Sequence, residues 1–86
     1  MPTIDHIDAA RVVIYLNDHR PAHVHVIKGD SKAVFILHCP KGPPELRESI
    51  GFSRAEIRHL LEESISRLAL FCGEWERYHG PDRQNS

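Results

Sequence analysis

Three of the chain's seven histidines lie in one short stretch, NDHRPAHVHV, which runs from Asn17 to Val26. His19 comes first, and His23 and His25 follow with a single valine between them. An imidazole titrates close to neutral pH and is also a common ligand of zinc, iron, nickel and copper. This stretch is therefore the first candidate for a functional site.

The cluster admits two kinds of chemistry, with a purely structural role as the alternative. His19, His23 and His25 could hold a divalent transition metal, with Asp18 or a water beside it and one position open to a substrate. Without a metal, the same three histidines could act as catalytic acids or bases, or stack on single-stranded nucleic acid. Asn17 and Asp18 could bind the ligand or orient a histidine, but short polar residues also form turns by bonding to their own backbone.

The residues after the cluster predict a β-hairpin that positions two of the histidines. HVHVIK (23–28) alternates apolar and polar residues, and KAVFILH (32–38) follows after a short turn that begins with Gly29. Successive side chains of a strand point to opposite faces, so Val24 and Val26 are expected in the core. His23 and His25 would then share the other face. A two-residue turn at 30–31 would bring His38 opposite His23 and add it to the site.

Two further strands and one helix complete the expected fold. RVVIYL (11–16) has the composition of a strand, CPKGPP (39–44) that of a loop, and ELRESIGF (45–52) that of a short edge strand. Ser53 and Glu56 form a capping box that starts a helix from Arg54 to His79, which would be about 39 Å long. The sequence thus predicts an α+β domain in which a three- or four-stranded, mostly antiparallel sheet packs on one long C-terminal helix.

The length of this helix raises the question of what covers its second half. It is about twice as long as a five-residue strand, so it must overhang the sheet, bend, or pack on another chain. Gly73 could bend it back onto the sheet. Alternatively, Leu70, Phe71 and Trp75 could offer an apolar surface for a homodimer.

Composition narrows the class of protein. The 86 residues fit one domain, expected over 1–80, with a loose tail at 81–86. A formal charge of -1 argues against strong, sequence-independent binding to nucleic acid backbones. No apolar run is long enough to cross a membrane and the start does not look like a secretory signal, so a cytoplasmic location is expected. Cys39 and Cys72 show no paired spacing, and in that compartment both would be free thiols.

The order of residues in the cluster resembles a known family. Asn17-Asp18-His19, then Pro21, then His23 and His25, followed by a strand, a glycine turn and a second strand, looks like the small prokaryotic family named domain of unknown function 4160. The likeness extends from the opening MPTID to the closing YHG. It carries Asn17, Asp18, His19, His23 and His25 over as the family's site.

The resemblance implies a kind of gene neighbourhood and partner rather than a particular reaction. Members of that family are often encoded beside another short protein, in arrangements like toxin and antitoxin pairs. It implies a small cytoplasmic protein that is toxin-like or regulatory, has a cognate protein partner and engages RNA through the histidines. Metal binding by the His-x-His strand is the first alternative, and a non-catalytic dimeric interaction module is the second.

Overall fold

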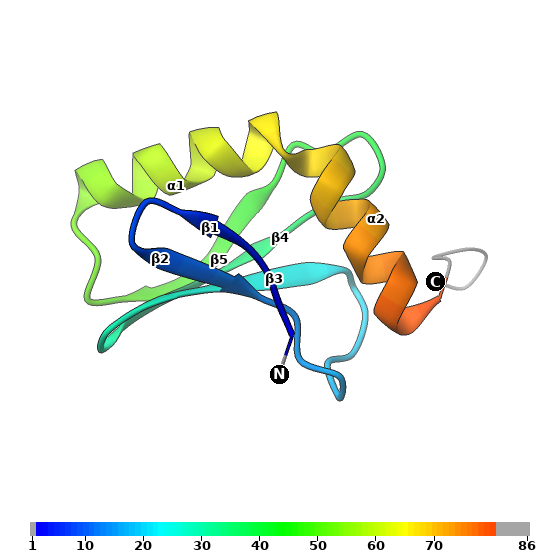
Figure 1. The fold of residues 1–86 in the computed structure, drawn as a ribbon. Helices are drawn as coiled ribbons and strands as arrows, with labels where there is room; N and C mark the ends of the chain where they lie inside the picture. The colour runs from blue at the N-terminus through cyan, green and yellow to red at the C-terminus, as the bar shows by residue number, and fades with distance from the viewer. Residues whose placement is uncertain (1, 81–86) are drawn as a thin grey trace.

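The computed structural model describes residues 2–80 and shows five strands followed by two helices (Figure 1). The strands form a single sheet in the order β1-β2-β3-β4-β5, and each neighbouring pair is antiparallel. The elements are β1 (Thr3–Ile7), β2 (Ala10–Val13), β3 (His23–Lys28), β4 (Ser31–Ile36), β5 (Glu45–Ile50), α1 (Arg54–Ser66) and α2 (Leu68–His79). The α+β class is confirmed, whereas three or four strands and one long helix are corrected to five strands and two helices. The predicted tail at 81–86 lies outside the described residues.

β1 is the strand that the sequence did not predict. Its residues TIDHI include strand formers, but Asp5 and His6 interrupt them and the apolar residues do not alternate, so no strand pattern stands out. It forms because it pairs along β2, with an irregularity between Thr3 and Asp5. β2 is shorter than the predicted 11–16, because the chain leaves the sheet after Val13 to form the loop that carries Asp18.

The predicted hairpin is present, but its turn lies one residue earlier than expected. Lys28 pairs with Ser31, so Gly29 and Asp30 make the turn, and Gly29 adopts the positive φ of 59° that glycine tolerates. His23 consequently faces Ile36 rather than His38. His38 lies beyond the end of β4 and bonds to Glu45 at 2.7 Å, so it does not join His23.

β5 is the edge strand that the sequence predicted, with an irregularity that the pattern did not show. Phe35 pairs with Leu46 and Val34 pairs with Glu48, which leaves Arg47 as an extra residue on β5. Such a bulge reverses the alternation, so Leu46 lies on the helix side while Ile50 lies on the other. All six residues of β5 are exposed.

The helical segment starts as predicted, but it breaks at Arg67 and not at the predicted Gly73. The capping box of Ser53 and Glu56 is present at the start of α1. The break falls at Arg67, whose backbone leaves the helical region (ψ 17°), and not at Gly73, which lies inside α2. α1 lies along one face of the sheet, and α2 turns down past its end toward the loop between β2 and β3 (Figure 1). Among the described residues, neither helix is long and apolar enough to cross a membrane.

The core lies between the helices and one face of the sheet. Phe71 and Trp75 are 0% and 1% exposed, so they belong to this core and are not the partner surface suggested for them. Leu70, in contrast, is 46% exposed. The prediction that Val24 and Val26 face the core is confirmed, since both are fully buried.

Cys39 and Cys72 are joined by a disulfide, so the expectation of two free thiols is wrong. Cys39 follows β4 and Cys72 lies in α2, and the turn of α2 toward the end of the sheet brings their Cα atoms to 5.8 Å. The two cysteines are 33 residues apart. Their pairing depends on the packing of α2, which no local spacing reveals.

Candidate functional site

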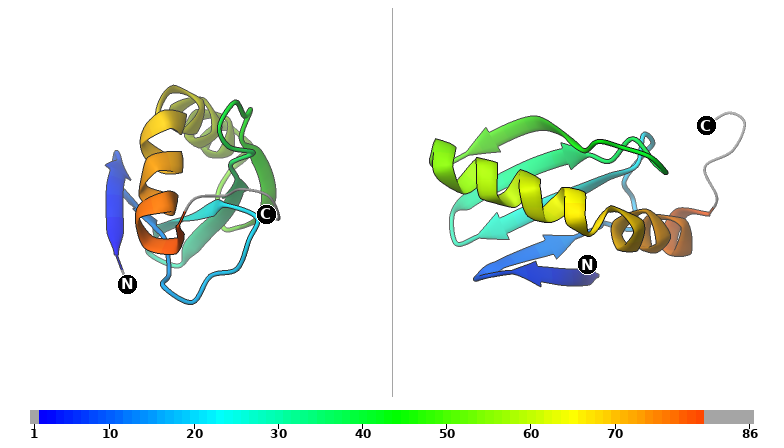
Figure 2. Two further views of the ribbon diagram at one scale, coloured as in Figure 1. Left: turned by 90° about the vertical axis from the view of Figure 1, so that its right-hand side faces the viewer. Right: turned by 90° about the horizontal axis from the view of Figure 1, so that it is seen from above.

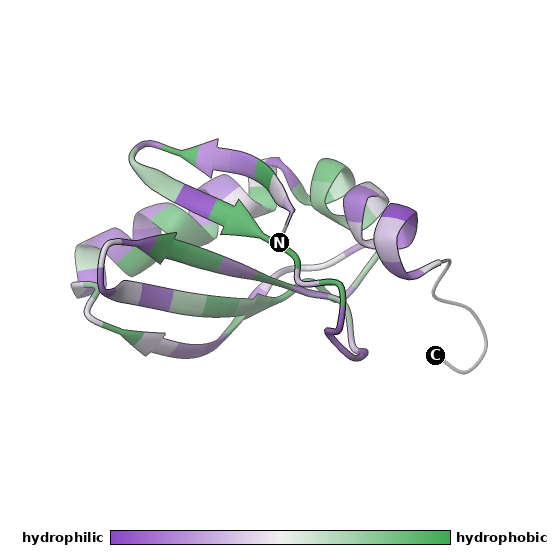
Figure 3. Ribbon diagram, turned by 60° about the horizontal axis from the view of Figure 1, so that its bottom comes forward, coloured by the Kyte–Doolittle hydropathy of each residue, from purple (hydrophilic) through white to green (hydrophobic). Residues whose placement is uncertain are grey.

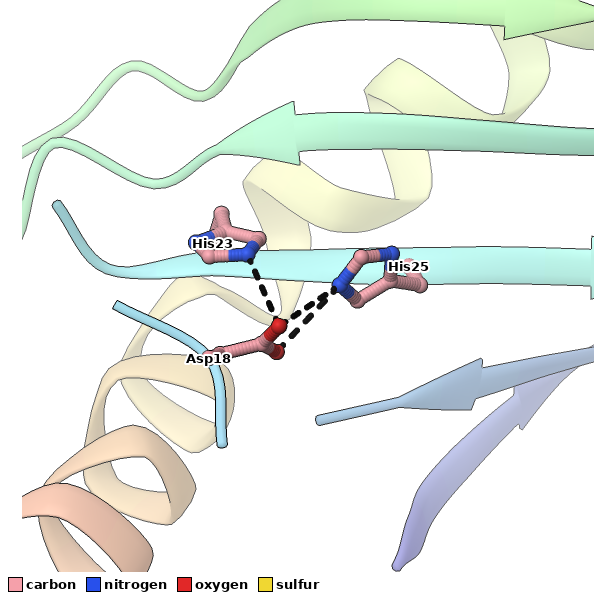
Figure 4. A group of neighbouring side chains, drawn as sticks. All are labelled: Asp18, His23 and His25. Atoms are coloured by element: carbon pink, nitrogen blue, oxygen red, sulfur yellow. Dashed lines mark hydrogen bonds and ion pairs between the residues drawn. The ribbon is translucent and has the colours of Figure 1, made fainter. Parts of the chain in front are cut away.

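Asp18, His23 and His25 form a compact group at the start of β3 (Figure 4). One donor atom from each side chain lies within 4.8 Å of the others. His25 pairs with Val13 of β2 and Val34 of β4, on the face of the sheet away from Val24 and Val26. Figure 3 views this uncovered face and shows hydrophilic and hydrophobic residues alternating along the strands. The β-strand alternation thus directs both imidazoles to one side, and the loop after β2 brings the carboxylate to them.

The carboxylate of Asp18 is held from one side by its own turn. Oδ2 accepts a hydrogen bond from the backbone N–H of Tyr15 at 2.9 Å, and the N–H of Asp18 donates to the carbonyl of Tyr15 at 3.0 Å. Asp18 therefore does the turn-forming work that the sequence suggested. Its side chain is only 12% exposed. Oδ1 remains directed at the histidines.

The ring of His23 is fixed in one tautomer by its neighbour Pro21. Nδ1 lies 2.8 Å from the carbonyl oxygen of Pro21, and because a carbonyl only accepts, Nδ1 carries the hydrogen. In the neutral ring, Nε2 then has a lone pair, and it faces Oδ1 of Asp18 at 3.5 Å. Two electron-rich atoms are thus directed at each other in a setting where the His23 side chain is only 8% exposed.

His25 lies on the other side of the same carboxylate. Its Nε2 lies 3.3 and 3.2 Å from the two oxygens of Asp18. It donates to them when the ring hydrogen is on Nε2, and its lone pair is open to a metal when the hydrogen is on Nδ1. Burial lowers the pKa of His25 below its ordinary value and outweighs the carboxylate of Asp18, which acts in the opposite direction. Burial therefore favours the neutral form of His25, which is the form that binds metals.

The end of α2 supports the loop that carries Asp18. Nε2–H of His79 donates to the carbonyl of Tyr15 at 3.1 Å, and the His79 ring stacks on Trp75 with centroids 4.1 Å apart. Trp75 in turn lies 5.3 Å from the ring of His23. Arg20 donates to the last carbonyls of the helix, at 3.5 Å to His79 and 3.3 Å to Gly80. The sequence analysis offered Trp75 only as part of a partner surface and His79 only as the end of the helix, and nothing in their spacing links them to the site.

The remaining predicted residues lie apart from this group. His19 and Asn17 are exposed in the loop, outside the cluster of donor atoms. Of the three histidines put forward, the structure therefore brings two together. Asp18, which the sequence offered as a binding or orienting residue, is the third member of the group.

Comparison with known families confirms the resemblance noted in the sequence. The family described as domain of unknown function (DUF4160) matches residues 10–76, which include the loop, β3 and most of α2. The chain belongs to this family. No curated protein and no solved structure matches the chain. Asp18, His23, His25 and the supporting Trp75 all lie inside the DUF4160 match, whereas His79 lies just beyond it.

Proposed function

We propose that this DUF4160 protein binds a divalent transition metal through Asp18, His23 and His25. The observation that carries the proposal is the 3.5 Å contact between His23 Nε2 and Asp18 Oδ1, two atoms that both present lone pairs when the His23 ring is neutral. Because Nδ1 of His23 holds the ring hydrogen, no proton of the neutral ring lies between them. A buried pair of this kind is unfavourable unless a cation joins it.

The spacing of the donor atoms also fits a metal. Ligands about 2.1 Å from a metal are separated by roughly 3.0 to 3.4 Å at octahedral or tetrahedral angles. Oδ1 of Asp18 lies 3.3 Å from Nε2 of His25 and 3.5 Å from Nε2 of His23, which is close to that range. All three donor atoms lie within 4.8 Å of one another, so a metal would draw the two imidazoles slightly together. Two imidazoles and one carboxylate make up the set found in catalytic zinc sites and in non-haem iron sites with open positions.

The hydrogen-bond partners of two of the ligands, Asp18 and His23, support this role. Tyr15 holds one oxygen of Asp18 and Pro21 holds Nδ1 of His23, so each side chain presents its other atom to the centre. Three protein ligands leave positions for water or substrate. A bound metal would activate such a water or polarise a bound substrate group, so any reaction at this site would be metal-assisted.

The test is metal titration of protein purified without a histidine tag and stripped of metal. We expect calorimetry with Zn²⁺, and with Fe²⁺ under anaerobic conditions, to give one site per chain. His23→Ala should weaken it by at least about 100-fold, because it removes a ligand rather than a supporting group. His19→Ala and His59→Ala serve as matched controls and should bind like the wild type. Absence of a stoichiometric site, or equal binding by His23→Ala, would rule the proposal out.

A second candidate function is RNA binding by a toxin-like protein, as the family resemblance implies. The specific observation in its favour is that Arg11 and Lys32 flank Ile27 on neighbouring strands. Ile27 is two residues along β3 from His25, so these cations share its face at a distance of roughly 7 Å along the strand. An RNA backbone could contact them while a base or phosphate reaches the site.

This candidate has its own test. Expression in a bacterial host should slow growth, and the protein should bind or cleave RNA at low salt. His23→Ala should abolish cleavage, while Arg11→Glu should weaken binding and lower its salt dependence. Normal growth together with no RNA binding at low salt would remove this candidate without affecting the metal proposal.

A further inference from the structure

The helix side of β5 is left uncovered by α1. Figure 2, viewed from above, shows α1 crossing the middle of the sheet and β5 lying to one side of it. All six residues of β5 are exposed, including the apolar side chain of Leu46, at 38%. β5 is also the last strand of the sheet, so one of its backbone edges faces away from β4. Such an edge can bond to an extended segment of another chain.

A groove of ≈ 490 Å³ lies between α1 and β5. Its apolar part is lined by side chains from β5, the loop before α1, and α1 itself: Leu46, Phe52, Ile57 and Leu61. None of these four is fully buried. Ile57 and Leu61 are four residues apart on α1, so they lie on the same side of the helix and continue the groove along its axis.

Two arginines line the same groove and give it a positive charge. Arg54 and Arg58 are four residues apart on α1 and are both exposed. Within residues 2–80, neither forms an ion pair with another side chain. This contrasts with Arg67 on the same helical segment, which is bonded to Asp5 and Glu63.

We propose that this groove binds an extended segment of a partner protein that carries apolar and acidic side chains. The apolar side chains of the partner would cover Leu46, Ile57 and Leu61, and its carboxylates would pair with Arg54 and Arg58. Charge complementarity would then determine which partners bind. A nucleic acid fits less well, because its phosphates could pair with Arg54 and Arg58 but would leave the apolar floor uncovered. A second copy in a two-fold contact would bring the same arginines against one another.

The groove is independent of the proposed metal site. It lies on the helix side of the sheet, whereas His25 lies on the opposite face. The two proposals can therefore fail separately.

The test uses the full chain, biotinylated, as bait for a phage library of random linear 12-residue peptides. Enriched peptides are then synthesised with a fluorophore and titrated by anisotropy at low and high salt. We expect enriched sequences that alternate apolar with acidic residues. Their affinity should fall at least tenfold with Arg54→Glu/Arg58→Glu and with Leu46→Gln, and should weaken with salt. Arg77→Glu, an exposed arginine on α2, is the matched control and should bind like the wild type.

Several results would overturn the proposal. These are a failure to enrich any sequence, enrichment of sequences without acidic residues, and retained binding by Arg54→Glu/Arg58→Glu. Self-association of the wild type through this face, seen as a dimer in sedimentation and lost in the same double variant, would also overturn it. Circular dichroism and thermal unfolding of each variant establish that a lost affinity does not come from unfolding.

Discussion

At the scale of single residues, the geometry of the site depends on two hydrogen bonds to the backbone, one made by Asp18 and one by His23. Tyr15 N–H occupies one oxygen of Asp18, and the Pro21 carbonyl occupies Nδ1 of His23. Oδ1 of Asp18, which also contacts His25, therefore faces Nε2 of His23 at 3.5 Å. The sequence motif places the ligands, but these two backbone contacts decide which atoms are available.

Asp18→Asn tests this arrangement, because it separates metal binding from stability. The amide has the shape of the carboxylate and its oxygen can still accept from Tyr15, while its NH₂ can donate to Nε2 of His23. We expect metal affinity to fall at least about 100-fold while the free energy of unfolding without metal changes by less than about 1 kcal/mol. Calorimetry and urea unfolding check the two halves. A large loss of stability would show that Asp18 acts mainly through its turn.

Ser64 is a second position where a single polar atom affects the stability of the protein. Its hydroxyl is fully buried in α1 and has no hydrogen-bond partner among the described residues. Ser64→Ala removes this unsatisfied group and improves helix propensity, so we expect a gain of about 1 kcal/mol in the free energy of unfolding. Urea unfolding measures it, with the exposed Ser66→Ala as control. A loss of stability would mean that the Ser64 hydroxyl has a partner after all.

At the scale of elements, the sequence predicted what local patterns determine. The β3–β4 hairpin, the edge strand near 45–52 and the start of α1 at Ser53 were all readable from alternation and capping. β1 was not, because its residues are strand-forming only when β2 is alongside. The turn at Gly29 and the bulge at Arg47 were also missed, since either shifts the pairing by a single residue without altering composition.

The break between α1 and α2 depends on contacts that are distant in the sequence. The guanidinium of Arg67 donates to Asp5 at 3.1 Å, to the carbonyl of His6 at 2.7 Å and to Glu63 at 2.8 Å. Burial disfavours its charge, but the bonds to Asp5 and Glu63 outweigh this and raise the pKa of Arg67. Arg67 thus joins the helix junction to β1, the element that the sequence did not show.

Arg67→Met should loosen β1 more than the rest of the sheet. Methionine keeps most of the apolar stem but none of the donors, and the partly exposed setting limits the cost to about 1 to 2 kcal/mol. Hydrogen exchange should show faster exchange of the β1 amides, with those of β3 and β4 changed only by the global loss. The guanidinium of Arg77 is largely exposed, so Arg77→Met should change neither the stability nor the exchange of the β1 amides. Uniform acceleration across the sheet would contradict a local role for Arg67.

At the scale of the whole molecule, α2 links the core to the site. Phe71 and Trp75 fill the core, His79 holds the Tyr15 carbonyl, and Cys72 attaches the helix to Cys39. The apolar stripe of this helix and its end at His79 were visible in the sequence. Its direction after Arg67, which brings the cysteines together and His79 to the ligand loop, is a property of the assembled fold.

The disulfide provides the test of this arrangement. Closing a loop between cysteines 33 residues apart restricts the unfolded chain, so its loss is expected to cost about 2 to 4 kcal/mol. Cys39→Ala/Cys72→Ala should lower the free energy of unfolding by that amount and so lower the urea midpoint, and excess dithiothreitol should lower the midpoint of the wild type similarly. The reductant should not affect the double variant, which is the control. Under denaturing, non-reducing conditions, thiol titration should find no free thiol in the wild type. Two free thiols there, or a midpoint insensitive to dithiothreitol, would show that α2 is held by packing alone.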